Sequence, residues 1–203
     1  MKNFLVVTIL LSLCCGAGGE EKQVTEPKPE AIQKSKHVLM VIAPKNFRDE
    51  EFKEPYELLN KSGMKVTVAS TDTTPATGML GAVVKPNITL EQVKADSFDC
   101  LIIVGGSGCK VLWDDTLVHK IAGEFNDVEK PIAAICIAPV VLGKAGLLKG
   151  KKVTAFPSVK EQLEECEAVY TDAALEKSGN IITCSGPESA KEFAEEILKA
   201  LTE

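Results

Sequence analysis

Short, continuous apolar segments alternate with amphipathic segments along most of the chain. Residues 37–43 and 98–104 are almost wholly apolar, which is typical of strands covered on both faces of a sheet. Residues 49–62 instead have apolar side chains at helical spacing, and Gly63 follows in the position that commonly ends a helix. Strands that alternate with helices predict an α/β domain with a mostly parallel central sheet.

The same pattern continues to the end of the chain and predicts one domain over residues 37–203. A hairpin is predicted at residues 81–85, and Thr89 is placed to cap a short helix. The predicted strands are residues 37–43, 65–70, 98–104, 131–136, 152–156, 168–170 and 181–183. The predicted helices are residues 49–62, a segment with Leu117, Ile121 and Phe125 on one face, and residues 138–145, 159–166 and 189–201.

The first 36 residues have a different character. Residues 1–19 start with one lysine, continue with an apolar run and end in small residues, which predicts a signal peptide or a lipoprotein leader. Cleavage within residues 16–19, lipidation of Cys14 or Cys15, and a merely hydrophobic helix all stay open. Residues 20–36 are charged, contain two prolines and predict a solvated linker. We therefore expect an exported protein that is either periplasmic or anchored to a membrane as a lipoprotein.

Composition narrows the range of functions. The chain of 203 residues has a formal net charge of −6 and one arginine, Arg48, so nucleic acid is a poor candidate partner. Two histidines are too few for a histidine-rich metal centre. The sequence also lacks metal-ligand spacings, a phosphate-binding loop and a dinucleotide fingerprint. We expect neither a metal nor an organic cofactor.

The strongest candidate for chemistry is Cys136. It follows a buried strand and precedes a helix that has Pro139 in its first turn, so its side chain is expected to project above the sheet edge where α/β sites gather. The positive end of that helix would favour a thiolate and lower the thiol pKa. The alternative is a small buried packing residue, because free cysteine is often buried.

Several segments around this cysteine resemble the ThiJ/PfpI superfamily, which includes a parkinsonism-associated deglycase and PfpI-type peptidases. The similarity extends over about residues 36–201, and no single motif is decisive, but the ordered set is specific. The matching segments are residues 133–139 (AAICIAP), 145–154 (AGLLKGKKVT), 105–106 (GG), 183–187 (TCSGP) and 51–63. The resemblance implies a flavodoxin-like three-layer sandwich, similar to class I glutamine amidotransferases.

The resemblance also implies roles for individual residues. Cys136 would be the nucleophile, and Glu51 would be its acidic partner, protonated by burial and able to relay a proton. The backbone N–H groups of Gly106 and Ile137 would form an oxyanion hole beside Gly105, and Pro187 would border the pocket. The residues alone instead favour a solvated acid at a helix start as the interpretation of Glu51.

This chain departs from the family pattern at two positions. PfpI-type peptidases have a histidine directly after the nucleophile, where this chain has Ile137, and the deglycase branch has one downstream, where it has Phe156. Neither His37 nor His119 obviously replaces them. A Cys–His dyad is the usual way to activate a thiol for amide cleavage, so its absence weighs against a peptidase.

The function we expect is glyoxalase or deglycase action on 2-oxoaldehydes such as methylglyoxal and on their protein adducts. The alternative is a redox sensor or chaperone that works through oxidation of Cys136, and a cysteine peptidase is the third. Cys109 and Cys184 are either resolving thiols near the site or packing residues, whereas Cys100 is expected in the core. Arg48 is either a binding group for an anionic substrate or a surface residue. The resemblance further implies a homodimer.

Overall fold

The computed structural model describes residues 35–203. The predicted leader and nearly all of the predicted linker lie outside the described residues. Within residues 35–203, no helix combines the length and the hydrophobicity needed to span a bilayer.

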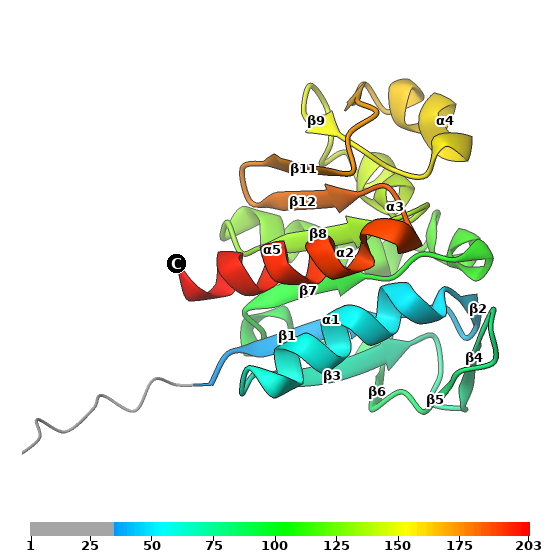
Figure 1. Cartoon of the computed structure of the whole chain (residues 1–203), viewed down its shortest axis with the longest axis vertical. Coiled ribbons are helices and arrows are strands. Elements are labelled where there is room, and N and C mark those ends of the chain that lie inside the picture. Colours follow the sequence, from blue (N-terminus) through cyan, green and yellow to red (C-terminus); the bar gives the residue numbers. More distant parts are fainter. Residues whose placement is uncertain (1–34) are drawn as a thin grey trace, which may run out of the picture. The chain divides into compact units, whose positions relative to one another are not determined.

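A seven-stranded sheet forms the centre of the domain, in the order β11-β12-β8-β7-β1-β3-β6. Every neighbouring pair is parallel except β11 and β12, which are antiparallel at one edge. The carboxyl ends of the parallel strands therefore share one edge of the sheet, on the right in Figure 1. The strands are β1 (His37–Val41), β3 (Lys65–Ser70), β6 (Ile88–Thr89), β7 (Cys100–Ile103), β8 (Ile132–Ile135), β11 (Leu175–Ser178) and β12 (Ile181–Cys184).

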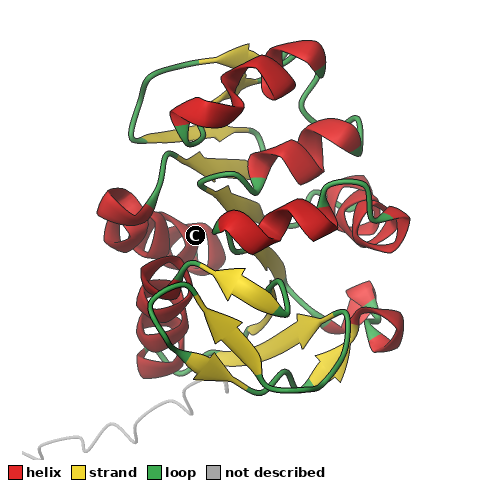
Figure 2. Ribbon diagram, turned by 90° about the vertical axis from the view of Figure 1, so that its right-hand side faces the viewer, coloured by secondary structure: helices red, strands yellow, loops and turns green. Residues whose placement is uncertain are grey.

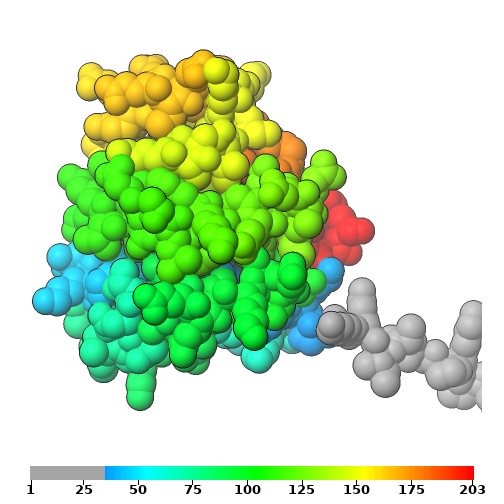
Figure 3. Space-filling view, turned by 180° about the vertical axis from the view of Figure 1, so that it is seen from behind, coloured from blue at the N-terminus to red at the C-terminus, as the bar shows by residue number. Residues whose placement is uncertain are grey.

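Helices cover both faces of this sheet (Figures 1 and 2). Helices α1 (Asp49–Lys61) and α5 (Ala190–Thr202) pack together on the face seen in Figure 1. Helices α2 (Thr116–Asp127) and α3 (Pro139–Lys144) cover the opposite face. Figure 3 shows the molecule from this side, where the green and yellow-green parts of the chain form the surface. Every residue of β7 and β8 is buried, which explains why those segments are continuously apolar. The predicted flavodoxin-like three-layer sandwich is confirmed.

Two smaller sheets and several short helices complete the domain. The elements are β2 (Lys45–Phe47), β4 (Ala76–Gly78) and β5 (Val83–Val84) in one sheet; β9 (Lys152–Val153) and β10 (Val169–Tyr170) in the other; helix α4 (Lys160–Glu165); and the 3₁₀ helices η1 (Leu90–Gln92), η2 (Ala95–Ser97), η3 (Ser107–Leu112), η4 (Pro157–Val159) and η5 (Pro187–Ser189). A hairpin does form in the predicted region, but it joins β4 to β5 and begins at Ala76, five residues before the predicted start. Its strand β4 pairs with β2 beyond the carboxyl ends of the main strands (Figure 2).

Some predictions about the elements were wrong. The strand predicted over residues 152–156 is only the two-residue β9, and β10 pairs with it in a separate sheet and does not join the main sheet. Strands β2, β6 and β11 had not been predicted. They are short or half-exposed, so they lack the apolar runs by which the central strands were recognised.

Candidate active site

The structure brings most of the predicted site residues to one cavity at the carboxyl edge of the sheet. Cys136 follows β8, the glycine pair follows β7, and Glu51 lies in the first turn of α1. The cavity has a volume of about 430 Å³. Its lining residues are Arg48, Glu51, Met79, Gly106, Ser107, Lys110, Cys136, Ile137, Phe156, Ser158, Pro187 and Glu188.

Cys136 has a backbone conformation that is unusual for a residue with a side chain. Its φ of +63° lies in the left-handed region, which costs roughly 1–2 kcal/mol outside glycine. Two hydrogen bonds hold the residue there: its N–H donates to the Cys184 carbonyl at 2.9 Å, and its carbonyl accepts from the Phe156 N–H at 2.8 Å. The side chain lines the cavity and is 8% exposed. This is the sharp strand-to-helix turn that the sequence predicted.

Glu51 is fully buried, so the interpretation as a solvated helix-start acid was wrong. Its Oε2 accepts a hydrogen bond from the Gly105 N–H at 3.1 Å. Its Oε1 is buried without a well-aligned donor, and the Cys136 thiol is a loose hydrogen-bond partner of the carboxyl. The two neighbouring acids have other contacts: Asp49 accepts from the backbone of the β4–β5 turn, and Glu50 pairs with Arg48.

Burial raises the pKa of both groups in the Cys136–Glu51 pair. The Glu51 pKa rises to about 7, because loss of solvent outweighs the hydrogen bonds from Cys136 and Gly105. The Cys136 pKa rises to about 12 because of burial and the charge of Glu51, although hydrogen bonds from the backbone N–H groups of Gly106 and Ile137 lower it. The pair therefore releases its first proton near neutral pH and holds the second far above it.

The raised thiol pKa corrects one expectation from the sequence. The positive end of the following helix was expected to lower the pKa of Cys136. Helix α3 has only six residues, and its field is weaker than the combined effects of burial and the Glu51 charge. A thiolate at this site is thus stabilised by the backbone N–H groups that contact the sulfur. It forms when the one proton that remains on the Cys136–Glu51 pair is on Glu51.

The glycines of the loop after β7 let the backbone pack tightly against the segment that leads into α1. A Cβ atom on Gly105 would lie 2.5 Å from Glu51 Oε2, and one on Gly106 would lie 2.4 Å from the Arg48 nitrogen. On Gly108 it would lie 1.7 Å from the Lys45 carbonyl oxygen in β2. This packing sets the position of Glu51 relative to Cys136.

Replacing Gly108 by alanine is expected to destabilise the protein by about 2–4 kcal/mol, because the new methyl group meets rigid backbone. Gly123, in the middle of α2, is the matched control: a Cβ there has no atom within 4 Å. Gly123→Ala should stabilise the helix by roughly 0.5–1 kcal/mol. Urea unfolding measures both changes. Equal stability of the two variants would contradict the packing described above.

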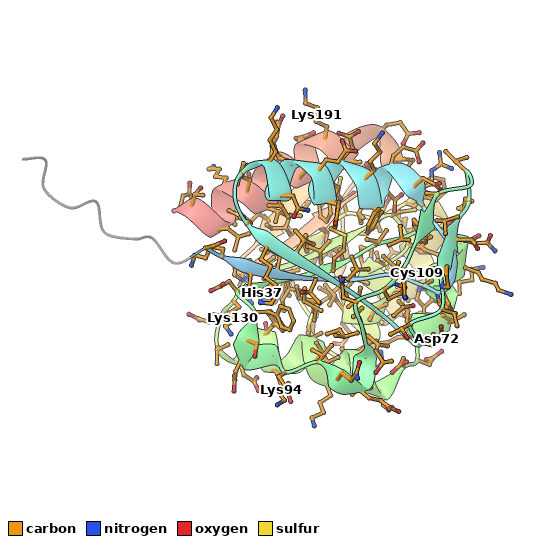
Figure 4. All side chains as sticks on the ribbon, turned by 90° about the horizontal axis from the view of Figure 1, so that it is seen from below. His37, Asp72, Lys94, Cys109, Lys130 and Lys191 are labelled. Carbon is orange, nitrogen blue, oxygen red and sulfur yellow. The ribbon has the colours of Figure 1, made fainter. Side chains whose placement is uncertain are left out.

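The two histidines lie away from the cavity. His37 is at the amino end of β1, where its ring bonds the Thr67 hydroxyl at 2.8 Å and the Ser97 carbonyl at 3.0 Å (Figure 4). His119 is in α2, and its Nε2 bonds the Trp113 carbonyl at 2.8 Å. No histidine among residues 35–203 lines the cavity, whereas Phe156 does. Within the same residues, no three His, Cys, Asp or Glu side chains gather as metal ligands.

The other residues that the sequence suggested for the site are paired or buried within the protein. Arg48 borders the cavity, but its guanidinium Nε pairs with Glu50 at 2.9 Å. Cys109 is fully buried in η3, and this burial raises its pKa, with smaller contributions from the charges of Cys136 and Glu51. Cys184 is buried in β12, and burial raises its pKa to about 11. All five cysteines of the described region are free thiols, and Cys100 is in the core.

Sequence reasoning missed part of the cavity wall. Ser107 and Lys110 come from η3, and Met79 comes from the β4–β5 turn. Ser158 comes from η4 and Glu188 from η5. The glycine-rich run at residues 105–108 was the available signal for η3. The contribution of Met79 depends on the pairing of β4 with β2, which no local pattern shows.

The chain belongs to the DJ-1/PfpI family, whose profile matches residues 36–200. An uncharacterized protein of Methanocaldococcus jannaschii is 40% identical over 99% of this chain and 98% of its own length. A deglycase of Pyrococcus horikoshii is 29% identical, and a putative cysteine protease of Bacillus subtilis is 32% identical; each match covers 80% of this chain and 98% or 97% of the relative.

The fold comparison gives the same family. The crystal structure of a ThiJ/PfpI domain protein from Brachyspira murdochii superposes with a TM-score of 0.80 at 33% identity. The match covers 83% of this chain and 97% of that structure.

Proposed function

We propose that this protein is a cysteine-dependent enzyme that converts 2-oxoaldehydes such as methylglyoxal to 2-hydroxy acids and removes the corresponding adducts from proteins. One observation carries the proposal: the Cys136 sulfur faces a cavity beside a buried carboxyl, Glu51, whose pKa is about 7. A group with such a pKa can both accept and donate a proton at neutral pH. Relatives that are named deglycases support it.

The proposed cycle uses only this pair and water. The Cys136 thiolate adds to the aldehyde carbon while the Glu51 carboxyl protonates the carbonyl oxygen, giving a hemithioacetal. The Glu51 carboxylate then removes the hydrogen of that carbon and returns it to the neighbouring former ketone carbon, while the hydroxyl proton passes to the second oxygen. The result is a thioester. Water attacks its carbonyl carbon, the thiolate leaves, and a 2-hydroxy acid is released.

The cavity suits a small electrophile. Its volume of about 430 Å³ falls within the usual range for small-molecule sites, and it combines apolar side chains such as Met79 and Phe156 with a few polar groups. An aldehyde is more electrophilic than an amide and needs no strongly basic leaving group. The reaction therefore does not require the histidine that is absent at positions 137 and 156.

The test is direct turnover by purified protein. Methylglyoxal is incubated with the protein at pH 7.5, and both its loss and the appearance of lactate are followed by NMR. The proposal expects lactate in amounts far above the enzyme concentration. Loss of methylglyoxal without formation of lactate, or with at most one equivalent of lactate per thiol, would mean that the aldehyde only modifies the protein. Either result would contradict the proposal.

A second candidate function is oxidation sensing at the same thiol. The Gly106 and Ile137 N–H groups and a protonated Glu51 contact the sulfur and would stabilise a sulfinate there. Two equivalents of peroxide would convert the thiol to the sulfinic acid and release two waters. Intact-mass measurement distinguishes this candidate: addition of two oxygens at Cys136 in a protein without aldehyde turnover favours sensing.

A peptidase is the third candidate. The protease-named relative supports it, but the part of the chain that the structure describes has no histidine beside Cys136 to activate the thiol. Casein hydrolysis that alkylation blocks would establish this activity. The export leader, the lipid anchor and the homodimer are likewise proposals. For the homodimer, the exposed apolar side chains of Leu80 and Val83 in the β4–β5 hairpin offer a surface for self-association.

A further inference from the structure

The turn that carries Cys136 receives one hydrogen bond from a side chain. The indole N–H of Trp113 donates to the Ile137 carbonyl at 3.1 Å. The hydrogen bonds at Cys136 itself, to Cys184 and from Phe156, join backbone to backbone. Trp113 is the single tryptophan of the chain, directly follows η3 and packs partly buried against the core.

Trp113 is itself fixed from two sides. Its carbonyl can only accept, so the contact with His119 Nε2 at 2.8 Å places a proton on that nitrogen. The ammonium group of Lys110, which lines the cavity, lies 5.6 Å from the centre of the indole ring, within cation–π range. Helix α2 thus holds the backbone of Trp113 through His119, and the indole of Trp113 holds the turn at Ile137.

The position of this hydrogen bond connects it to the sulfur. The N–H of Ile137 contacts the Cys136 thiol, and the carbonyl of the same residue is the one that Trp113 holds. The two groups belong to successive peptide planes that meet at the Ile137 Cα, so a displacement of this residue would move both. Without the indole N–H, the buried carbonyl loses its partner, and the strained turn gains freedom to relax away from the sulfur.

We propose that Trp113 is a positioning residue for the Cys136 thiol: its indole N–H holds Ile137 so that the Ile137 N–H stays directed at the sulfur and stabilises the thiolate. This inference rests on the proposed role of Cys136 as the reactive thiol. It concerns the sulfur and does not depend on which electrophile the enzyme takes.

The test removes the N–H and keeps the shape of the side chain. Because the chain has one tryptophan, growth of a tryptophan auxotroph on benzothienylalanine replaces the indole N–H with sulfur at this site alone. The rate of Cys136 alkylation by iodoacetamide is then measured by mass spectrometry from pH 5 to pH 10. We expect the rate at pH 7.5 to fall about fivefold and the pH profile to shift upward, the effect of losing one hydrogen bond.

Two variants complete the design. Trp113→Phe should show the same shift as the sulfur isostere. Asn180→Ala is the matched control, because Asn180 also donates to a backbone carbonyl, that of Lys130, at the opposite end of β8. It should leave the alkylation profile unchanged.

An isostere-containing protein whose alkylation rate and profile match the wild type would overturn the positioning role, as would an equal shift in Asn180→Ala. Failure of the proposed function has a different signature. If the wild type makes no lactate but the isostere still slows alkylation, the positioning role stands and the aldehyde chemistry does not.

Discussion

Cys136→Ser is expected to lose methylglyoxal turnover by roughly three orders of magnitude or more, as is usual when a covalent nucleophile is removed. A serine hydroxyl ionises far less readily than a thiol, and Glu51, with a pKa of about 7, is too weak a base to compensate. Serine is close to cysteine in size, so the turn should keep its fold. Turnover is measured as lactate formed at pH 7.5, with thermal unfolding as the check on folding.

The matched control is Cys166→Ser. Cys166 follows α4, is half-buried and does not line the cavity. This variant should retain wild-type turnover. Comparable losses in both variants, or residual activity above a tenth of wild type in Cys136→Ser, would contradict a nucleophilic role for Cys136.

Glu51→Gln is expected to change activity and stability in opposite directions. Glutamine keeps the shape of the side chain but cannot move a proton, so lactate formation should fall by about 10² to 10⁴. At pH 8 the same variant should be more stable than the wild type, because the folded wild type carries a buried carboxylate. Removing that charge relieves the cost of its burial.

The pH dependence follows from the direction of the pKa shift. The folded pKa of Glu51 is about 7, above its ordinary value of 4.5, so the folded state binds more protons than the unfolded state between these values. Wild-type stability therefore falls as pH rises through this window, by about 3 kcal/mol in all. Glu51→Gln removes this dependence, and its stability gain should be largest near pH 8 and small at pH 5.

Urea unfolding at pH 5 and pH 8 measures this effect. Glu54→Gln, an exposed position in the same helix, is the control and should show no such gain. A Glu51→Gln variant that is less stable than the wild type at pH 8 would show that the carboxylate contributes more through its hydrogen bonds than its burial costs.

The middle strands of the central sheet could be predicted from the sequence because they are buried on both faces. The runs that became β1, β7 and β8 are almost wholly apolar, and the carboxyl ends of β7 and β8 put the glycine pair and Cys136 at one edge. Glu51 was different. Its local sequence, three acids at a helix start, indicated a solvated residue, and only the family resemblance indicated the buried partner.

What the sequence could not indicate depends on long-range contacts. Strand β2 exists because it pairs with β4, about thirty residues further along, and Gly108 accommodates it. The contact between Trp113 and Ile137 joins residues 24 positions apart. The direction of the thiol pKa shift was also predicted wrongly, because burial depends on the packed structure and a short helix was given too much weight.

The central claim is that Cys136 and Glu51 share one proton, and the pH dependence of Cys136 alkylation tests it most directly. In the wild type the alkylation rate should rise through a midpoint near 7, where the pair releases its first proton. In Glu51→Gln that step should vanish, and the rate should rise only above the ordinary thiol value of about 8.5, because burial still opposes the thiolate. Identical profiles with a single midpoint near 8.5 in both proteins would contradict the shared proton and the chemistry built on it.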